Sequence, residues 1–384
     1  MKKILFISHD ATPSGAPIVL LGLIEWLKAN TDIEITVLLK DGGPLAKKFS
    51  ELAPVYFFNL TYAMPGNRLA SFFYRRVVYP FLERRHKATL FEQLKQKNFD
   101  LIYSNTIANG SVLEFLAGLK CKVLSHIHEL QFVIDCLGEE NARQVVAHTQ
   151  TYIAVSAQVK QHLCKRFNLP EEKIVQIPPF IDFSRVEKLK SEIDSGALKR
   201  ELGIPENAFV IGCAGSLEWR KGGDIFVSTA INAVKKLPNA YFIWVGGERD
   251  KNLLSRLRFD IEKAGLPNRI LFTGYKPNPY PYFAMWDLFL LTSREDPYPL
   301  VCLENMYLQK PVVCFAGSGG GEPLVGNYQC GVAVPYMDIE EATKAISVYC
   351  LNVKGATIVD INRLKTEHDI NMAGVQILQA INKL

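Results

Sequence analysis

The chain has 384 residues, of which 48% are hydrophobic and 22% are charged, and its formal net charge at pH 7 is +5. This length favours two domains, the composition is that of a soluble globular protein, and the sequence has no run of about 18 apolar residues that could span a membrane. The charge excess is mild and no base-reading motif accompanies it, which argues against nucleic acid as a partner.

The first apolar run, Lys3–Ser8, stops at polar residues, so we expect a β-strand here and not a secretory leader. The eight cysteines are scattered, and several lie inside apolar runs. They lack the paired spacing of zinc ligands, which favours reduced core thiols in a cytoplasmic protein.

Strand and helix patterns alternate along the first half of the chain. Further strands are expected at residues 33–39, 54–59, 101–104, 123–126, 152–155 and 174–177. A helix is expected at residues 18–29, after a loop that contains Gly15. Glycine at a strand-to-helix turn lets backbone N–H groups approach an anion, but a plain tight turn explains it as well.

Basic residues are concentrated at residues 67–99, which hold eight Lys and Arg residues against two Glu residues. Between Arg68 and Lys97 these charges alternate with aromatic and aliphatic side chains. The pattern is typical of contact with an anionic membrane surface, and equally of solvated helices that pack one face on the core.

Polar residues end two of the expected strands, with Asn105-Thr106 after the first and His126 and His128 around the end of the second. Two histidines on one strand face suggest a zinc site, but no third ligand accompanies them. We therefore expect one histidine whose hydrogen bonds are satisfied within the protein and one that contacts substrate.

A proline pair, Pro178-Pro179, is the best candidate for a domain boundary. Beyond it we expect a polar helix at residues 185–202 and strands at residues 209–214, 241–245, 270–273, 288–291 and 311–315. Further helices are expected at residues 225–236, 300–309 and 371–383. Two such series predict an α/β protein with two Rossmann-like parallel-sheet domains that face a central cleft.

Two adjacent cations, Arg220 and Lys221, lie in the turn between the first strand and the first long helix of the second series. They could bind the diphosphate of a nucleotide-sugar donor, or they could be exposed loop charges. Neither series has a G-x-G-x-x-G after its first strand, which argues against a dinucleotide enzyme.

Three acids belong to one expected β-α-β unit: Glu295 and Asp296 follow a strand, and Glu304 lies in the helix that comes next. Ligands bind at the carboxyl ends of parallel strands, where this corner would lie. A buried acid such as Glu304 needs a partner, either within the protein or a ligand hydroxyl. The pair could also carry out general acid–base chemistry, and spacing alone does not decide between these roles.

These motifs together resemble the family 4 retaining glycosyltransferases of GT-B fold, over nearly the whole chain and most clearly at residues 209–334. Residues 296–304 resemble the E-x7-E motif of that family, with Asp296 in place of the first glutamate. Residues 215–222 resemble its phosphate-contacting loop, residues 243–247 the strand end that follows, and residues 319–321 the glycine turn after the motif.

The resemblance implies roles for the site residues. Glu304 would bind the ribose and Arg220 and Lys221 the diphosphate. Asp296, together with Glu295, would face the donor sugar. Three glycines at turns, Gly15, Gly247 and Gly320, would let the backbone approach the donor. His128, in the first domain, would contact the transferred sugar. The family needs no metal and no cofactor, and front-face displacement would require no protein nucleophile.

The resemblance also implies the architecture and the activity. An acceptor-side domain would span residues 1–180 and a donor-binding domain residues 181–365, and a helix at about residues 366–384 would pack back on the first domain. The chain would transfer a sugar to a saccharide or lipid-linked saccharide in cell-surface polysaccharide, lipopolysaccharide or glycolipid biosynthesis. It would act in the cytoplasm, either free or on the inner face of the cytoplasmic membrane. The alternatives are a non-catalytic GT-B accessory subunit, which the altered first acid suggests, and a sugar-nucleotide epimerase.

Overall fold

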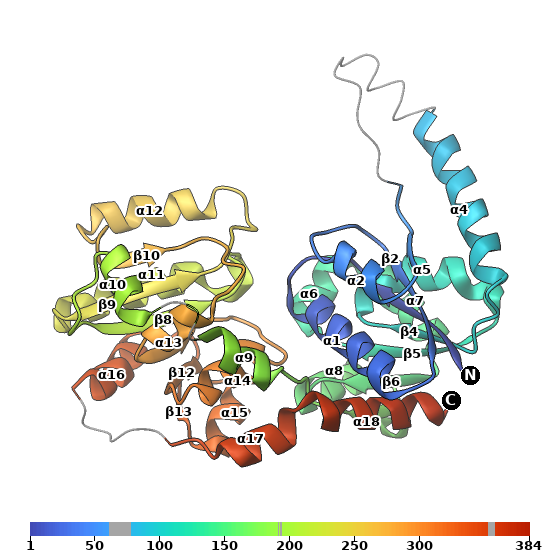
Figure 1. Ribbon diagram of the computed structural model, residues 1–384. Helices are drawn as coiled ribbons and strands as arrows, with labels where there is room; N and C mark the ends of the chain where they lie inside the picture. The colour runs from blue at the N-terminus through green and yellow to red at the C-terminus, as the bar shows by residue number, and fades with distance from the viewer. Residues whose placement is uncertain (61–77, 191, 193, 352–357) are drawn as a thin grey trace. The chain divides into compact units, whose positions relative to one another are not determined.

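The computed structural model describes residues 1–60, 78–190, 192, 194–351 and 358–384. The chain forms two compact units. Unit 1 comprises Met1–Pro178 and Ile370–Leu384, and unit 2 comprises Pro179–Asp369. Each unit is an α/β layer structure around one parallel sheet (Figure 1).

Unit 1 contains a seven-stranded parallel sheet in the order β3-β2-β1-β4-β5-β6-β7. Its strands are β1 (Lys3–Ser8), β2 (Glu34–Leu39), β3 (Val55–Phe57), β4 (Leu101–Ser104), β5 (Lys122–Ile127), β6 (Thr151–Ala154) and β7 (Ile174–Gln176). Consecutive residues of the central strands are buried, as in Ile4 to Ile7. Both faces of the sheet are therefore covered, which is why these strands are continuous apolar runs.

The helices of unit 1 alternate with these strands along the chain. They are α1 (Gly15–Asn30), α2 (Ala46–Leu52), α4 (Tyr79–Lys95), α5 (Gly110–Leu116), α6 (Gln131–Leu137), α7 (Glu139–His148), α8 (Ala157–Phe167) and α18 (Ile370–Asn382). Helix α1 begins at Gly15, three residues before the predicted start at Ile18. Pro17 does not prevent this, because the amide groups of a first helical turn have no partner within the helix.

Unit 2 contains a six-stranded parallel sheet in the order β10-β9-β8-β11-β12-β13. Its strands are β8 (Phe209–Ala214), β9 (Ala240–Val245), β10 (Ile270–Phe272), β11 (Leu288–Leu291), β12 (Val312–Phe315) and β13 (Gly331–Val334). Strand order reverses direction between β8 and β11, which is the position where such sheets bind ligands. The predicted fold class, two Rossmann-like parallel-sheet domains, is confirmed.

The helices of unit 2 are α9 (Phe183–Lys190), α10 (Ser195–Glu201), α11 (Gly223–Lys236), α12 (Leu253–Lys263), α13 (Tyr280–Met285), α14 (Leu300–Tyr307), α15 (Gly321–Tyr328), α16 (Ile339–Cys350) and α17 (Ile361–His368). The single helix predicted at residues 185–202 is wrong, because α9 ends at Lys190 and α10 begins at Ser195. Asp194 starts the second helix: its side chain accepts a hydrogen bond of 2.8 Å from the backbone N–H of Ala197. This N-cap favours a new helix start over continuation of the first helix.

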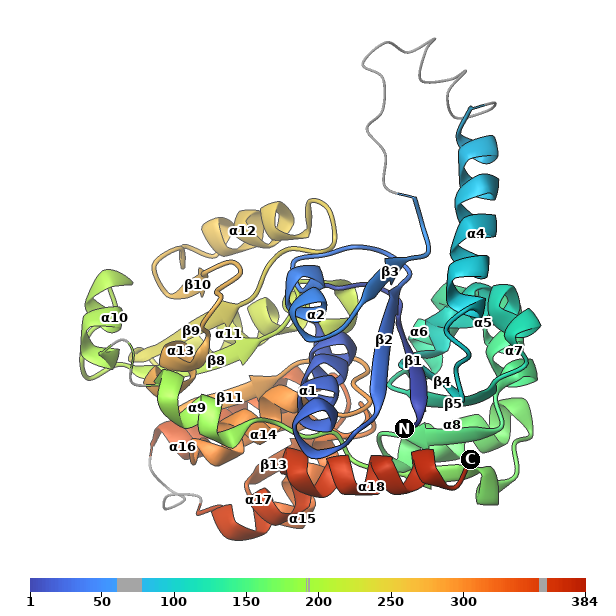
Figure 2. The ribbon, with the colours of Figure 1, turned by 45° about the vertical axis from the view of Figure 1, so that its right-hand side comes forward.

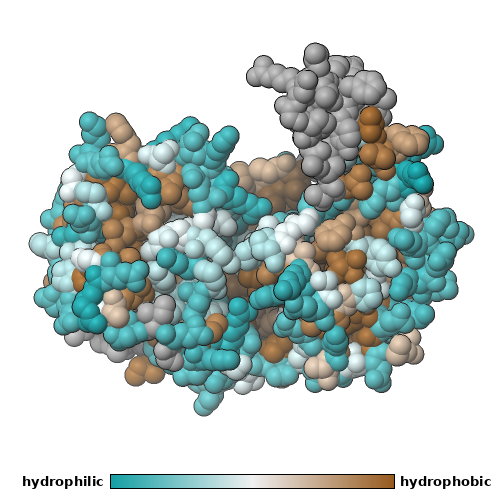
Figure 3. Space-filling view, turned by 45° about the horizontal axis from the view of Figure 1, so that its top comes forward, coloured by the Kyte–Doolittle hydropathy of each residue, from teal (hydrophilic) through white to brown (hydrophobic). Residues whose placement is uncertain are grey.

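The basic segment of the sequence lies partly outside the described residues, since Arg68, Arg75 and Arg76 fall in the range 61–77. The described part includes α4, which extends away from the sheet of unit 1 in both ribbon views (Figures 1 and 2). Leu90 and Leu94 are buried near the inner end of α4, whereas Phe81 is 66% exposed near its outer end. Apolar side chains gather beside that outer end on the face shown in Figure 3.

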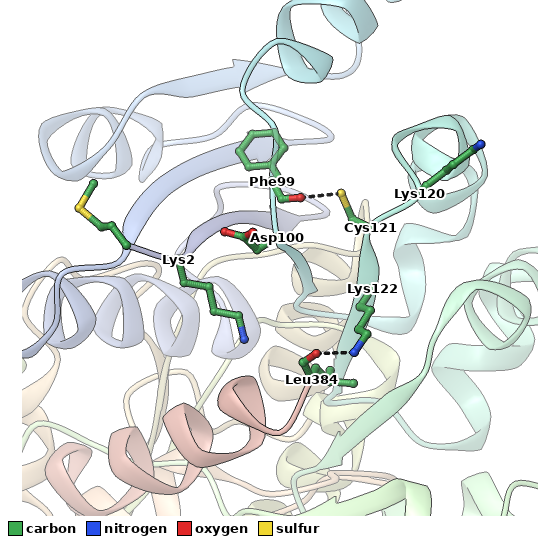
Figure 4. A pocket seen from close by; sticks show the side chains of 8 residues that line it. Lys2, Phe99, Asp100, Lys120, Cys121, Lys122 and Leu384 are labelled. Atoms are coloured by element: carbon green, nitrogen blue, oxygen red, sulfur yellow. Dashed lines mark hydrogen bonds between the residues drawn. The ribbon is translucent and has the colours of Figure 1, made fainter.

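The final helix, α18, lies beside α1 within unit 1 (Figure 2). Trp26 Nε1 donates a hydrogen bond of 2.9 Å to Asn371 Oδ1 near the beginning of α18. Lys2 Nζ donates 2.6 Å to the carbonyl of Ile381. Lys122 Nζ donates 2.5 Å to the carbonyl of Leu384 (Figure 4). Cations at the carbonyl end of a helix satisfy its last acceptors and complement its dipole, so these lysines help hold α18 on the sheet.

Candidate active site

The loop after β8 positions Arg220 and Lys221 in a 3-10 turn, Trp219–Lys221. Gly222 ends this turn with a φ of +74°, and a Cβ atom there would lie 2.1 Å from the carbonyl oxygen of Thr292. Thr292 Oγ1 in turn donates 2.9 Å to the carbonyl of Lys221. The loop is thereby held against the end of β11, and only glycine fits at the turn.

The side chains of Lys221 and Asp296 meet at the carboxyl ends of β8 and β11. Lys221 Nζ lies 2.5 Å from Asp296 Oδ2, and the two side chains are 18% and 7% exposed. Ser293 Oγ donates to the same carboxylate oxygen at 3.4 Å. The predicted diphosphate cation and the predicted sugar-facing acid therefore form one mostly buried ion pair.

The guanidinium of Arg220 bonds to groups within unit 2. Nη1 donates 2.8 Å to the carbonyl of Glu295, and Nη2 donates 3.0 Å to Glu218 Oε1. Arg220 thus joins the cationic loop to the acidic loop and holds the backbone of Glu295, which is itself partly buried. A guanidinium has five N–H donors, so these bonds leave donors for an oxyanion.

The glycine turn after β12 packs on the backbone of the acidic loop. Asp296 N–H donates 2.7 Å to the carbonyl of Ser318, and Gly320 N–H donates 2.8 Å to the carbonyl of Asp296. Gly319 has a φ of +117°, and a Cβ atom there would lie 2.1 Å from the Asp296 carbonyl oxygen. The structure therefore brings Gly320 and Asp296 together, as residues of one bridged pair of loops.

Glu304 lies on α14 and is partly buried. Tyr280, on α13, donates a hydrogen bond of 3.0 Å from its hydroxyl to Glu304 Oε1. Burial raises the pKa of Glu304 to about 7, while the Tyr280 bond and the charge of Arg185 act in the opposite direction. The carboxyl group therefore titrates near neutral pH.

Gly247 follows β9 and lies against the cationic loop. Its carbonyl accepts a hydrogen bond of 2.8 Å from Leu217 N–H. The five candidate positions Arg220, Lys221, Gly247, Asp296 and Gly320 are thus linked through loops at one edge of the unit 2 sheet. Glu304 lies on α14, the helix that follows the loop containing Asp296.

Arg294 and Tyr280 are site residues for which the sequence predicted no role. Arg294 donates from Nη1 and Nη2 to the two oxygens of Asp224, at 2.9 and 2.6 Å, and its guanidinium stacks 4.6 Å from the centre of the Trp219 ring. Burial works to raise the pKa of Asp224, but the bonds and charge of Arg294 hold it below its ordinary value. This fork anchors the acidic loop to the start of α11.

In unit 1, Gly15 is the first residue of α1, and Ser14 precedes it in extended conformation. A Cβ atom on Gly15 would meet no atom within 4 Å. The packing of unit 1 therefore does not require glycine at this position. Asp10 orders the loop before it by accepting from Thr12 N–H and Thr12 Oγ1 at 3.1 and 2.9 Å.

His128 lies after β5 and is linked to the Gly15 loop through Asn105. Its Nε2 lies 3.1 Å from Asn105 Oδ1, and Asn105 Nδ2 donates 2.7 Å to the carbonyl of Ala16. Burial, followed by the nearby His9, lowers the pKa of His128 to about 3, so the imidazole is neutral. Only the strand-end position of Asn105 had marked it in the sequence.

His126 forms a hydrogen bond within the protein at one ring nitrogen: its Nδ1 lies 2.7 Å from the hydroxyl of Tyr103. His126 is 1% exposed, and its Nε2 has no hydrogen-bond partner among the described residues. The described ranges hold no group of three His, Cys, Asp or Glu side chains placed to bind a metal. In those ranges, no helix has both the length and the apolar character needed to cross a membrane.

A pocket near the amino-terminal ends of the unit 1 strands is lined by Lys2, Asp100, Lys122 and Leu384, among others (Figure 4). These residues lie at the amino-terminal ends of β1, β4 and β5 and at the end of α18. All candidate site residues of unit 1 follow the carboxyl ends of strands instead. The pocket is therefore separate from the candidate site.

Two family models match the chain. Residues 13–185 match a model described as Glycosyltransferase Family 4, and residues 194–353 match one described as Glycosyl transferases group 1. Together the two matches take in most of both units.

Curated proteins of bacterial glycolipid and lipopolysaccharide synthesis are similar to parts of the chain. Alpha-galactosylglucosyldiacylglycerol synthase of Streptococcus pneumoniae is 27% identical over 198 residues, which cover 47% of this chain and 51% of that protein. The lipopolysaccharide core biosynthesis mannosyltransferase LpsB of Rhizobium meliloti is 28% identical over 167 residues, which cover 42% of this chain and 47% of that protein. The chain spans about half the length of these curated relatives.

Solved structures share the fold over the full chain. Anabaena Alr3699/HepE in complex with UDP and glucose has a TM-score of 0.81 and 21% identity, with 100% of both chains covered. A glycosyltransferase from Rickettsia africae ESF-5 has a TM-score of 0.77 and 18% identity, covering 100% of this chain and 98% of that one. The fold is thus that of GT-B glycosyltransferases.

Proposed function

The chain belongs to the family 4 glycosyltransferases of GT-B fold, and from this premise we propose that it is a metal-independent, retaining enzyme that uses a nucleoside-diphosphate-sugar donor. The acceptor we propose is a saccharide or a lipid-linked saccharide of a cell-surface polysaccharide, lipopolysaccharide or glycolipid. Two relatives support the acceptor class, since one is an alpha-galactosylglucosyldiacylglycerol synthase and the other a lipopolysaccharide core biosynthesis mannosyltransferase. The HepE structures with UDP and with UDP-glucose support the donor class.

The observation that carries the proposal is the pairing of Lys221 with Asp296 at 2.5 Å. It places a cation suited to a diphosphate directly beside an acid suited to sugar hydroxyls. As the donor bond breaks, negative charge builds on the leaving diphosphate. A fixed ammonium group stabilises that charge more in the transition state than in the ground state.

The other residues contribute binding and orientation. Glu304 would accept hydrogen bonds from the ribose diol, which needs the carboxylate form of a group whose pKa is about 7. Arg220 would add N–H donors to the diphosphate while it holds the Glu295 carbonyl. In the front-face reaction, a donor phosphate oxygen takes the acceptor proton, and the new glycosidic bond forms on the face that the diphosphate leaves.

In unit 1, Gly15 and His128 are proposed to contact the donor. Gly15 begins α1, so its backbone could approach a phosphate without steric cost from a side chain. His128 is neutral and would form a hydrogen bond with the transferred sugar.

The experiment that tests the function is a screen of nucleoside-diphosphate-sugar donors by thermal shift, followed by turnover and product analysis. A bound donor raises the melting temperature by mass action. We expect one donor to stabilise the chain, turnover that persists in EDTA, and a product with the donor's anomeric configuration. Inversion would overturn the retaining mechanism, and loss of turnover in EDTA would overturn metal independence.

The accessory-subunit alternative is tested by calorimetry on the same donor panel. A catalytic transferase binds at least one donor, whereas heat from none of them would favour the accessory role. Product analysis without added acceptor tests for an epimerase, which would convert one nucleotide sugar into another.

We also propose that the segment between Arg68 and Lys97 contacts anionic membrane from the cytoplasmic side. Its described part, α4, presents Phe81 at 66% exposure on a helix that also carries Arg84 and Arg85, both exposed. Apolar side chains next to cations are suited to an anionic lipid surface. Flotation with anionic liposomes should show binding at low salt that weakens at moderate salt, and an Arg84→Glu, Arg85→Glu variant should bind less. Failure to bind at low salt would end this proposal.

A further inference from the structure

The side chain of Asn105 is fully buried at the end of β4 and makes two directed hydrogen bonds. Nδ2 lies 2.7 Å from the carbonyl oxygen of Ala16, and Oδ1 lies 3.1 Å from His128 Nε2. The amide thus joins the start of α1 to the residue after β5. Ala16 directly follows Gly15, and Gly15 and His128 are both proposed above to contact the donor.

The carbonyl of Ala16 fixes which way the amide faces. A carbonyl oxygen can only accept, so the NH₂ group of Asn105 must point to Ala16 and its oxygen must point to His128. An amide oxygen also only accepts, so Nε2 of the imidazole must carry the proton. We propose that Asn105 is a positioning residue that locks neutral His128 in its Nε2–H tautomer, so that Nδ1 accepts a hydrogen bond from a hydroxyl of the donor sugar.

The surroundings of His128 support a fixed, uncharged ring. Its backbone N–H donates 3.0 Å to Glu129 Oε2, and its ring lies 4.1 Å from that of His126, centre to centre. Glu129 also accepts from Thr106 Oγ1 and from the N–H of Ile107. Burial, together with His9, keeps the pKa of His128 at about 3, so the ring does not gain a second proton at neutral pH.

The tautomer limits the chemistry that the ring can recognise. A neutral imidazole that presents an Nδ1 lone pair attracts a hydroxyl proton and repels a carboxylate. This part of the inference rests on the proposed function: the sugar group that faces His128 would be an alcohol, as in a neutral hexose, and not the acid group of a uronate. Asn105 would therefore contribute to donor specificity without contacting the donor.

The tautomer can be measured without any activity assay. The chain has seven histidines, so a ¹⁵N-histidine sample gives a tractable spectrum in which a His128→Gln variant identifies the ring. We expect the wild-type chain to show a protonated Nε2 and a bare Nδ1. In Asn105→Leu, which removes the acceptor, we expect the two tautomers to mix. Asn105→Asp keeps an acceptor oxygen and should keep the proton on Nε2.

A control variant, Asn109→Ala, removes a neighbouring buried amide that bonds to Ser104 Oγ and not to His128. It should leave the His128 tautomer unchanged. A wild-type His128 protonated on Nδ1, or an unchanged tautomer in folded Asn105→Leu, would overturn the assignment. If Asn105→Leu does not fold, the wild-type and Asn105→Asp spectra still decide it.

Donor specificity is then measured as the ratio of kcat/KM for a neutral hexose donor to that for the matching uronate donor. The wild type should prefer the neutral donor, and Asn105→Leu should lose about tenfold with it, the size of one hydrogen bond. A preference for the uronate would overturn the ligand class. If no donor is turned over while the tautomer is as expected, the proposed function fails and the tautomer assignment stands.

Discussion

Lys221 Nζ lies 2.5 Å from Asp296 Oδ2, although the two residues are 75 positions apart in the chain. They meet because β8 and β11 are neighbours in the sheet and each residue belongs to the loop after one of these strands. A diphosphate that binds Lys221 would therefore compete with Asp296 for the same ammonium group. Binding of the donor would release the carboxylate toward the sugar.

Replacement of Lys221 by alanine should lower turnover by about 100-fold or more, because a contact that strengthens in the transition state is lost. Steady-state kinetics with the identified donor measures this. Lys236→Ala is a matched control, since Lys236 is a paired surface lysine on α11. A Lys221→Ala variant with turnover like the wild type would contradict the role of this residue.

The Lys221–Asp296 pair should also couple energetically. A double-mutant cycle with Lys221→Met and Asp296→Asn should give a coupling of about 1–3 kcal/mol in urea unfolding, because the pair is mostly buried. Lys236 and Glu340 lie at the same distance, 2.5 Å, but their side chains are 45% and 51% exposed. That pair should couple more weakly, because water and salt screen exposed charges. Equal coupling in both pairs would show that burial does not strengthen the site pair.

Glu304 should make the stability of the wild type depend on pH. Burial raises its pKa from the ordinary 4.5 to about 7, so the folded state holds the proton more tightly than the unfolded state. The contribution of the protonated Glu304 side chain to the free energy of unfolding is therefore fully present below pH 4.5 and is lost as the pH rises through 7. Relative to wild type, Glu304→Gln should gain up to about 3 kcal/mol between pH 4.5 and pH 7.5.

Urea unfolding at a series of pH values measures this difference, with Glu262→Gln, an exposed acid on α12, as the control. Donor binding should show the opposite trend and tighten as the pH rises through 7, because the ribose diol donates to the carboxylate. A flat difference between wild type and Glu304→Gln would contradict the raised pKa.

Two glycine substitutions should separate packing from ligand contact. Gly222→Ala should destabilise unit 2 by about 2 kcal/mol or more, because residue 222 has a φ of +74° and its Cβ atom would meet the Thr292 carbonyl. Gly15→Ala should change stability by less than about 0.5 kcal/mol, since no atom lies near its Cβ position. If the Gly15 backbone contacts the donor phosphates, that variant should nevertheless raise the Kd for donor. Unchanged donor affinity would remove Gly15 from the site.

The fold was largely predictable because parallel strands buried on both faces leave continuous apolar runs, as in β1 and β11. The prediction of one helix at residues 185–202 was wrong, because the amphipathic spacing of the sequence continues across the N-cap of a second helix at Asp194. An N-cap is a single side-chain hydrogen bond, and polar residues in a polar stretch give little sign of it. Strand β13 was not predicted, and three of its four residues are only partly buried.

Motif residues of the site could be placed at strand ends, but their contacts could not. The bonds of Tyr280 to Glu304 and of Arg294 to Asp224 span 24 and 70 positions. Such contacts depend on strand order and helix placement, which local patterns do not contain. Asn105 was visible only as a polar residue after a strand, and its role depends on the positions of Ala16 and His128 on two other elements.

The position of α18 in unit 1 affects how the chain can fold during synthesis. Residues Met1–Pro178 leave the ribosome first, but Ile370–Leu384, which belong to the same unit, leave it only after all of unit 2. Unit 2 is continuous and can complete its core while α1 still exposes the surface that α18 covers. Unit 1 thus depends on residues 370–384, which are synthesised only after all of unit 2.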